Sequence, residues 1–188
     1  MRQLSFTPLQ PHAVTCVCFT GKEEMITGSS DGSLCVWRAG KVSHSVAAHG
    51  GGVSAVAGCG GGEGFWSCGA DGSLTRWSVD AASEVVLVMR QSHSISSFLQ
   101  GTLCLPPAQF AATSLSVRPG YSGQVALGLP FGSVVVFEAG SDGGRGRMSR
   151  VTEGGGGGVV KAVVGLNRTP HLFLTASGDC TPNMIFCK

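Results

Sequence analysis

The sequence predicts an all-β fold that is built from repeated units. Glycine accounts for 30 of the 188 residues, and charged residues make up only 13%. Val, Ser, Thr, Phe and Trp recur in short runs between the glycines, a mixture that strands prefer and helices do not. No long window has apolar residues at the i, i+3, i+4, i+7 spacing of an amphipathic helix. A motif also recurs along the chain, and its spacing indicates the kind of unit.

The clearest repeat joins two segments in the first half of the chain. Gly28–Trp37 has the sequence GSSDGSLCVW, and Gly69–Trp77 has the sequence GADGSLTRW. The two tryptophans are 40 residues apart, and so are the two Asp-Gly pairs. That period is typical of the four-stranded blade of a β-propeller. Each copy also predicts a hairpin, because Asp-Gly between two apolar runs favours a tight turn.

Two weaker copies follow. Gly128–Phe137 has Phe131 in place of the turn Asp and Phe137 in place of the Trp. The last copy combines Ala176–Asp179 with Asn183–Phe186. The sequence therefore predicts about four blades in a single partial propeller over residues 1–188. The expected blades are 12–48, 49–92, 112–153 and 159–188, with long loops at 91–111 and 139–158.

The fourth blade offers only three strands, which predicts an incomplete ring. Repeat units bury their faces only against neighbours, and propellers close their ring to protect strand edges. We therefore expect an open arc that is part of a larger propeller. The expected strands are Val14–Phe19, Met25–Ser29, Ser33–Trp37, Val42–Val46, Val53–Gly58, Phe65–Gly69, Ser73–Ser78, Glu84–Met89, Ser114–Val117, Gln124–Leu129, Ser133–Glu138, Met148–Thr152, Val160–Leu166, Leu172–Ala176 and Asn183–Cys187.

At the repeated residues the chain resembles the WD-repeat family. The hallmark of that family is a Gly-His dipeptide, a strand, an Asp turn and a Trp-Asp ending. Here Pro11-His12 and Ala48-His49 stand at the Gly-His position. The endings are Trp37-Arg38 and Trp77-Ser78, so the final Asp is absent from both.

The resemblance implies a buried hydrogen-bond chain of His, a strand Ser or Thr, the turn Asp and the Trp. In the first blade the matching positions are His12, Ser29, Asp31 and Trp37. In the second blade they are His49, Asp71 and Trp77, with Gly69 where a hydroxyl is expected. The presence of this hydrogen-bond network is therefore doubtful in the second blade, and we expect no such network in the last two blades. These residues are expected to hold the blades together and not to form a binding or catalytic site.

A narrower resemblance covers about 30 residues. Ile26–Gly40 and Val46–Val53 are similar to the echinoderm microtubule-associated protein-like (EML) group, which often has a Thr-Gly turn strand, a short Trp-x-x-Gly hairpin and an Ala-His before the next strand. This resemblance implies microtubules as the partner and the cytoskeleton as the location.

The pattern of reactive residues does not favour catalysis. Gly28–Gly32 matches G-x-S-x-G, but it lies in a strand–turn–strand unit, whereas a nucleophile elbow needs a strand-to-helix turn. The glycine run 154–158 lacks the Gly-Lys-Ser/Thr of a phosphate loop. The five histidines form no H-x-x-H pair and the eight cysteines form no CxxC pair, so we expect no metal, cofactor or disulfide.

Charge and the N-terminal residues bear on partners and location. A net charge of +2 is too small to favour nucleic acid or an anionic membrane. Residues 1–11 lack the apolar region of a secretory signal, and no apolar stretch is long enough to span a bilayer. Cysteines that serve as buried hydrophobes are typical of a reducing compartment, which predicts a cytoplasmic location.

The sequence thus favours a non-catalytic protein-interaction scaffold with its specificity in the loops. One alternative is a non-autonomous fragment of a larger WD-repeat adaptor. Another is a propeller enzyme, which would gather carboxylates, histidines or metal ligands at the central channel; the chain has only eleven acidic residues. The identity of the partner, the face that binds it, the full blade count and the oligomeric state stay open.

Overall fold

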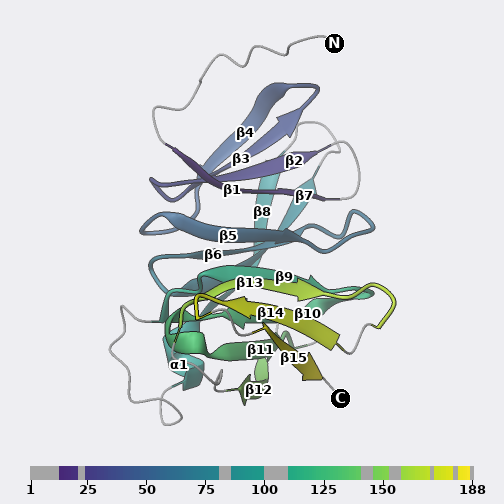
Figure 1. Cartoon of the computed structure of the whole chain (residues 1–188). Helices are drawn as coiled ribbons and strands as arrows, with labels where there is room; N and C mark the ends of the chain where they lie inside the picture. Colours follow the sequence, from purple (N-terminus) through teal and green to yellow (C-terminus); the bar gives the residue numbers. More distant parts are fainter. Residues whose placement is uncertain are drawn as a thin grey trace, which may run out of the picture.

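The computed structural model describes most of the chain as β-sheet. It describes residues 13–20, 24–80, 86–99, 110–140, 146–152, 158–169, 172–179 and 182–186. Strands β1 to β15 account for most of these residues, and the helix α1 (Ile95–Leu99) is one short exception. Figure 1 shows the strands in layers along the molecule, with α1 beside the third layer.

The strands form four antiparallel sheets, in which spatial order follows chain order. Sheet 1 contains β1 (Val14–Phe19), β2 (Met25–Ser29), β3 (Ser33–Arg38) and β4 (Lys41–Ala47). Sheet 2 contains β5 (Val53–Gly58), β6 (Phe65–Gly69), β7 (Ser73–Asp80) and β8 (Val86–Ser94). Sheet 3 contains β9 (Ser114–Arg118), β10 (Tyr121–Gly128), β11 (Val134–Glu138) and β12 (Arg147–Thr152). Sheet 4 contains β13 (Val160–Gly165), β14 (Leu172–Ser177) and β15 (Pro182–Phe186).

The Asp-Gly turns join the second and third strands of sheets 1 and 2, as the sequence predicts. Gly32 has φ +87° and Gly72 has φ +73°, a conformation that glycine accepts without strain. In both turns the Asp carboxylate accepts hydrogen bonds from the Ser two residues later. The Ser33 and Ser73 backbone N–H groups each lie 3.0 Å from the Oδ1 atom of Asp31 or Asp71.

The corresponding turn of sheet 3 departs from this pattern. Pro130–Gly132 forms a single 3₁₀ turn, labelled η2, and Phe131 has φ +75°. A side chain is strained in that region of backbone space. Phe131 occupies the position that the repeat gives to Asp. This turn therefore lacks the carboxylate that accepts hydrogen bonds from the Ser two residues later in the other turns.

Two of the expected loops are wrong in part. Residues 91–94 of the expected loop 91–111 belong to β8, because β7 is long enough to pair with them: Leu74 pairs with His93 and Ser73 with Ser94. Residues 95–99 of the same loop form α1. The expected loop 139–158 contains β12, which pairs with β11. Residues 100–109, 141–145 and 153–157 lie outside the described part of the chain.

The sheets pack face to face in chain order. We call the side of a sheet that faces the preceding sheet its front face, and the opposite side its rear face. The rear face of sheet 1 packs on the front face of sheet 2, where Ile26 and Leu34 meet Val53, Phe65 and Trp77 in one core cluster. Two further clusters join sheet 2 to sheet 3 and sheet 3 to sheet 4.

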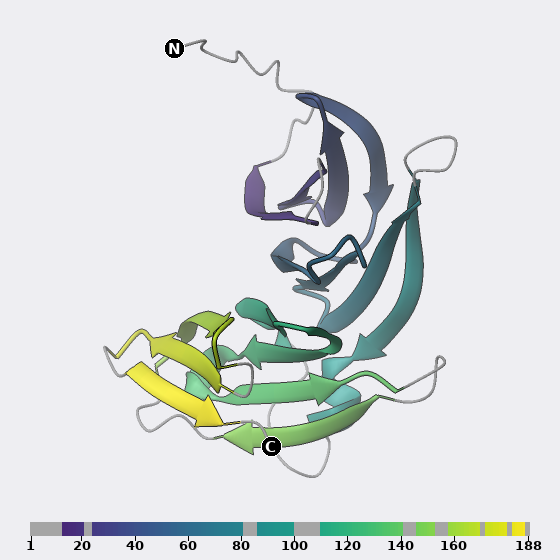
Figure 2. The same cartoon turned by 90° about the vertical axis from the view of Figure 1, so that its right-hand side faces the viewer.

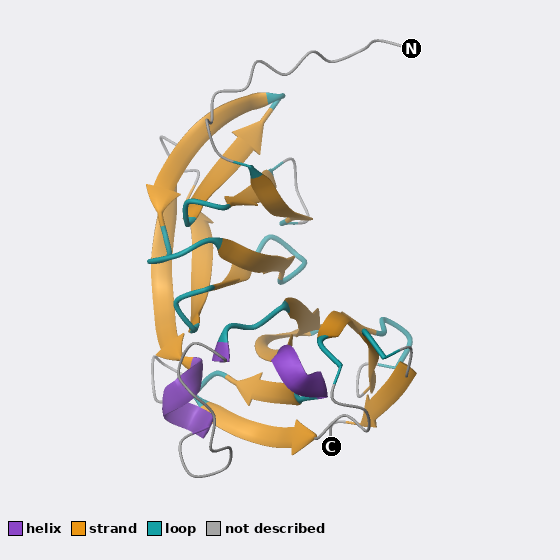
Figure 3. Cartoon of the chain, turned by 60° about the vertical axis from the view of Figure 1, so that its left-hand side comes forward, coloured by secondary structure: helices purple, strands orange, loops and turns teal. Residues whose placement is uncertain are grey.

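The first strands of the sheets lie next to one another. β1 contacts β5, β5 contacts β9, and β9 contacts β13. Figures 2 and 3 show the resulting shape: the four sheets form an open arc, with sheet 1 at one end and sheet 4 at the other. The expected all-β, open-arc architecture is therefore confirmed.

Candidate functional site

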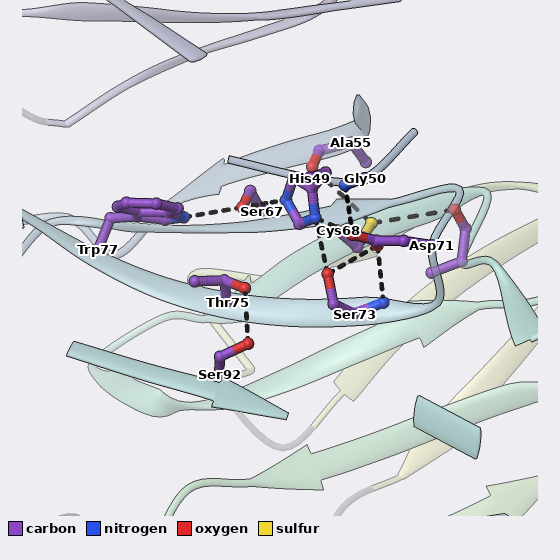
Figure 4. Close-up of polar contacts among 11 residues, drawn as sticks. His49, Gly50, Ala55, Ser67, Cys68, Asp71, Ser73, Thr75, Trp77 and Ser92 are labelled. Carbon is purple, nitrogen blue, oxygen red and sulfur yellow. Dashed lines mark hydrogen bonds and ion pairs between the residues drawn. The ribbon is translucent and has the colours of Figure 1, made fainter. Parts of the chain in front are cut away.

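A hydrogen-bonded network runs through sheet 2 (Figure 4). The indole Nε1 of Trp77 lies 2.8 Å from Ser67 Oγ, and Ser67 Oγ lies 2.7 Å from His49 Nε2. On the other side of the ring, His49 Nδ1 lies 2.7 Å from Ser73 Oγ and 3.3 Å from Asp71 Oδ1. The network thus connects the segment before β5, two strands and the Asp-Gly turn.

The chemistry of these groups fixes the direction of donation. An indole N–H can only donate, so Ser67 Oγ accepts from Trp77. An ionised carboxylate can only accept, so Ser73 donates to Asp71 and accepts from His49 Nδ1–H, and in the neutral imidazole Nε2 then accepts the Ser67 proton. Nε2 is therefore the unprotonated nitrogen, and Nδ1–H donates to Ser73. The Ser73 hydroxyl donates to Asp71 Oδ1 over 2.7 Å, and the Gly50 N–H donates to Asp71 Oδ2 over 2.8 Å. Every member is satisfied with a neutral imidazole.

The pKa shifts agree with that arrangement. Burial lowers the pKa of His49, although the nearby Asp71 carboxylate opposes the shift. Burial alone would raise the pKa of Asp71, but hydrogen bonds from Ser73 and Gly50 lower it overall. A neutral His49 beside an ionised Asp71 is therefore the state at neutral pH.

Gly69 has a different role from the one that the repeat suggested. A Cβ at this position would lie 2.6 Å from Cγ and Nδ1 of His49, so the absence of a side chain makes room for the imidazole. The hydroxyl of the network is Ser67, two residues earlier on the same face of β6. The expectation of a doubtful network in the second blade was wrong for this reason.

Sheet 1 differs from the expectation in a similar way. Trp37 Nε1–H donates to Thr27 Oγ1 over 2.8 Å, and not to Ser29. Trp37 pairs across the strands with Met25, so Thr27 is its diagonal neighbour, whereas Ser29 is two residues further along β2. Ser29 donates to the Ala13 carbonyl instead, over 3.3 Å. His12 lies outside the described residues.

Ser67, His49 and Asp71 stand in the order of a hydrolase triad, but their surroundings do not suit catalysis. The Ser67 side chain is fully buried, and its oxygen already accepts the Trp77 indole proton. A nucleophilic serine needs an exposed oxygen that can reach the substrate. The network therefore joins strands of sheet 2 and does not form a reaction centre.

In sheet 3 apolar residues replace the network. Leu127 and Phe137 stand where sheet 2 has Ser67 and Trp77, and both are buried. Phe137 packs against Trp66, with ring centroids 5.9 Å apart, and against His93 at 4.7 Å. Phe98 of α1 completes this aromatic cluster. Burial lowers the pKa of His93.

On β1 the front face of sheet 1 is exposed, although the same positions are buried in the other sheets. On the same face of β2 and β3, Thr27, Ser29 and Cys35 are buried. Val17 pairs with Thr27 as Val56 pairs with Ser67 and Val163 with Thr175. Val17 is 53% exposed, whereas Val56 is 8% and Val163 5% exposed. Neighbouring positions on this strand are exposed too, at 55% for Val14 and 66% for Phe19. We call Val14, Val17 and Phe19 the front end face.

The rear face of sheet 4 is exposed in the same manner. Val164, Leu174 and Met184 are cross-strand neighbours, exposed at 53%, 38% and 65%. The positions equivalent to Leu174 in sheets 1, 2 and 3 are fully buried; they are Ile26, Trp66 and Ala126. Ala162, Ala176 and Pro182 extend the patch along the same side of the sheet. We call Val164, Leu174 and Met184 the rear end face.

The described cysteines behave as small hydrophobic residues. Burial raises the pKa of Cys18 and Cys68 to about 12 and that of Cys59 to about 11. Cys16, Cys18, Cys35, Cys59 and Cys68 are not in disulfides. Within the described ranges, no group of three or more His, Cys, Asp or Glu residues could hold a metal ion. No helix in the same ranges is long and apolar enough to cross a membrane.

The comparisons with known proteins agree with this architecture. Residues 3–38 match the family model WD40, described as WD domain, G-beta repeat. No curated protein matches the sequence. The β-propeller domain of Cps50 (Swd1) from Myceliophteria thermophila superimposes with a TM-score of 0.73 at 14% identity, over 94% of this chain and 51% of that chain.

Two designed proteins have a similar structure. Ika4 superimposes with a TM-score of 0.66 at 19% identity, over 95% of this chain and 94% of that chain. Ika8 gives a TM-score of 0.63 at 20% identity, over 93% of this chain and 46% of that chain. The chain thus spans about half the length of the Swd1 domain and of Ika8. Residues 3–38 match the WD40 model, and the chain has the fold of an open β-propeller arc.

Proposed function

We propose that this chain is a non-catalytic scaffold that binds proteins through the two ends of its arc. The observation that supports this most strongly is the exposure of the front and rear end faces. Val17 and Leu174 are 53% and 38% exposed, whereas equivalent positions in the other sheets form the core. Large apolar patches on a folded protein favour association. The occupant that fits each end is a sheet of the same architecture.

The central part of the arc is suited to the rigid role of a scaffold. The network from Trp77 to Asp71 fixes the turn of sheet 2 to its strands, and apolar clusters join each sheet to the next. A satisfied buried network rigidifies its surroundings. Binding segments at the ends and in the loops would therefore be held in a fixed geometry.

The test is a comparison of the proteins that bind the wild-type chain and an end-face variant in cells. Val17→Asp combined with Leu174→Asp places a charge on both end faces, and Met89→Asp places one on β8, where Met89 is 60% exposed. We expect a protein that binds the wild type and Met89→Asp directly when purified and binds the double variant at least tenfold more weakly. Equal binding of every captured protein to all three chains would contradict the proposal.

Microtubules are the more specific partner that we propose. Support comes from the resemblance of Ile26–Gly40 and Val46–Val53 to the EML group, which would also imply a cytoskeletal location within the cytoplasm. The test is sedimentation with polymerised tubulin. Co-sedimentation that saturates with tubulin concentration is the expected result, and recovery of all the folded chain in the supernatant would contradict it.

A larger WD-repeat adaptor is the alternative to an autonomous scaffold. The same exposed end faces support it, because additional sheets of one polypeptide could cover them. Unfolding of the isolated chain distinguishes the two. A cooperative transition of the chain alone favours an autonomous scaffold, and a broad transition without a defined midpoint favours the adaptor.

A further inference from the structure

We propose that two copies of this chain associate front to rear and close a ring of eight sheets. The front end face of each copy packs on the rear end face of the other. This inference rests on the proposed function, since it names the protein that covers the end faces.

The contacts inside the chain show which surfaces fit together. Every contact between neighbouring sheets joins the rear face of one to the front face of the next. In the first contact Ile26 and Val36 of the rear face meet Val53 and Phe65 of the front face. The last contact is built in the same way. Its rear-face residues, from sheet 3, are Ala126, Val134 and Val136, and its front-face residues, from sheet 4, are Val160, Val163 and Phe173.

Each end face corresponds to one side of the contact that joins neighbouring sheets inside the chain. Sheet 1 presents a front face in which Val14 corresponds to Val53 and Val160, which are 1% and 2% exposed. Sheet 4 presents a rear face in which Met184 corresponds to Val36, which is fully buried. A second copy therefore brings to each end the kind of face that the interior sheets meet there.

Both end faces can lose water at little electrostatic cost. Strands β1, β2, β14 and β15 contain no Lys, Arg, Asp or Glu, and β13, which carries Val164, contains one charged residue, the exposed Lys161. Burial of an unpaired charge opposes association, whereas burial of apolar area drives it. Two charged residues of sheet 1, Arg38 at the end of β3 and Glu24 just before β2, are paired with each other.

A pair of copies leaves neither face uncovered. Each arc has one front and one rear end face, so a two-fold axis produces two identical contacts and closes the assembly. The length of known propellers agrees with an assembly of two copies. The chain covers 51% of the Swd1 β-propeller domain and 46% of Ika8, so two copies supply the extent of either. A chain of this extent also corresponds to nearly all of Ika4, at 94%.

The test is sedimentation equilibrium of the 188-residue chain over a range of concentrations. One copy has a mass of 19.2 kDa, and we expect a species of about 38 kDa at high concentration. Val17→Asp alters only the front end face and Leu174→Asp only the rear end face, so each variant alone should be monomeric. Met89→Asp, on sheet 2, should dimerise like the wild type. Far-UV circular dichroism checks that each variant is folded.

Mixing the two variants gives the sharpest result. In an equimolar mixture, the unaltered front face of the Leu174→Asp chain meets the unaltered rear face of the Val17→Asp chain. One of the two contacts is then intact, and dimers should reappear, with affinity below that of the wild type. Front-to-front association would instead leave Leu174→Asp dimeric on its own, and would overturn the proposal.

A folded wild-type chain that stays monomeric at every concentration would also overturn it, as would a dimer that neither variant disrupts. These failures differ from a failure of the proposed function. A monomer whose end faces bind another protein in the capture experiment retains that function, and only the second copy is excluded as the partner.

Discussion

His49 lies between two hydroxyl groups, and its neutral form accepts a hydrogen bond from one while it donates to the other. Ser67 donates to Nε2, and Nδ1–H donates to Ser73, while the ring lies against the bare Cα of Gly69. Three residue types are therefore required together at this point: a hydroxyl, an imidazole and a glycine. The repeat in the sequence identified His49, Asp71 and Trp77 but assigned Gly69 the hydroxyl's place.

Gly69→Ala should destabilise the chain, because its Cβ would overlap the His49 ring at 2.6 Å. Overpacking of this kind costs about 1–3 kcal/mol of unfolding free energy. Gly50→Ala is a matched control, since its Cβ would meet Asp71 Cβ at an ordinary 3.7 Å. Urea unfolding measures both. Equal stability of the two variants would show that the ring is not held against Gly69.

Stability should fall when the pH drops from about 7.5 to about 5.5. The pKa of His49 and of His93 is lowered in the folded chain, whereas the unfolded value is about 6.5. Above that value neither state binds the proton, and stability is complete. Below it the unfolded chain takes up protons first, so stability is lost until the pH passes the folded pKa. Thermal unfolding at the two pH values measures the loss.

Replacement of His93 alone measures how much this residue contributes to the loss of stability at low pH. His93→Phe keeps an aromatic ring beside Phe137, whose centroid is 4.7 Å away, and removes the titrating group. We expect a smaller loss of stability between the two pH values than in the wild type. An unchanged loss in His93→Phe would exclude His93 as a source.

The sequence could not distinguish Thr27 from Ser29, or Ser67 from Gly69. Residues two apart in a strand lie on the same face, so periodicity makes both positions equivalent. Only the register between strands decides which hydroxyl reaches the indole. That register places Trp37 opposite Met25 and Trp77 opposite Phe65, and it depends on pairing that a single sequence does not specify.

At the scale of elements, the hairpins were predictable and the connections were not. Asp-Gly sets the turn through its own backbone preferences, so Asp31-Gly32 and Asp71-Gly72 determine the hairpins locally. The end of β8 depends instead on β7, which pairs with it as far as Ser73 and Ser94. The short helix α1 depends on packing, since Ile95 and Leu99 are buried in the cluster between sheets 2 and 3.

The turn at Phe131 is an element that a substitution can improve. Phe131 has φ +75° and is 44% exposed, so it combines backbone strain with little burial. Phe131→Gly should raise the unfolding free energy by about 0.5–1 kcal/mol, because glycine adopts this conformation freely. Phe131→Ala removes the same ring but retains Cβ, and should show no such gain. A glycine variant less stable than the alanine variant would contradict this account.

At the scale of the whole molecule, the open arc follows from the number of repeats, which the sequence shows. Two strong and two weak copies predict four sheets, and four sheets are observed. The end faces could not be found in the same way. Val17, Val56 and Val163 are all valines at one position of the repeat, and only the arrangement of sheets makes the first exposed and the others buried.

The central claim is that the two ends of the arc expose faces that its interior sheets bury. Hydroxyl-radical footprinting of the wild-type chain, at a concentration at which it sediments as a monomer, tests this without any substitution. Phe19 and Met184 are 66% and 65% exposed, whereas Phe65 and Phe173 are fully buried. We predict strong oxidation of Phe19 and Met184 and very little of Phe65 and Phe173. Equal protection of all four side chains would contradict the account.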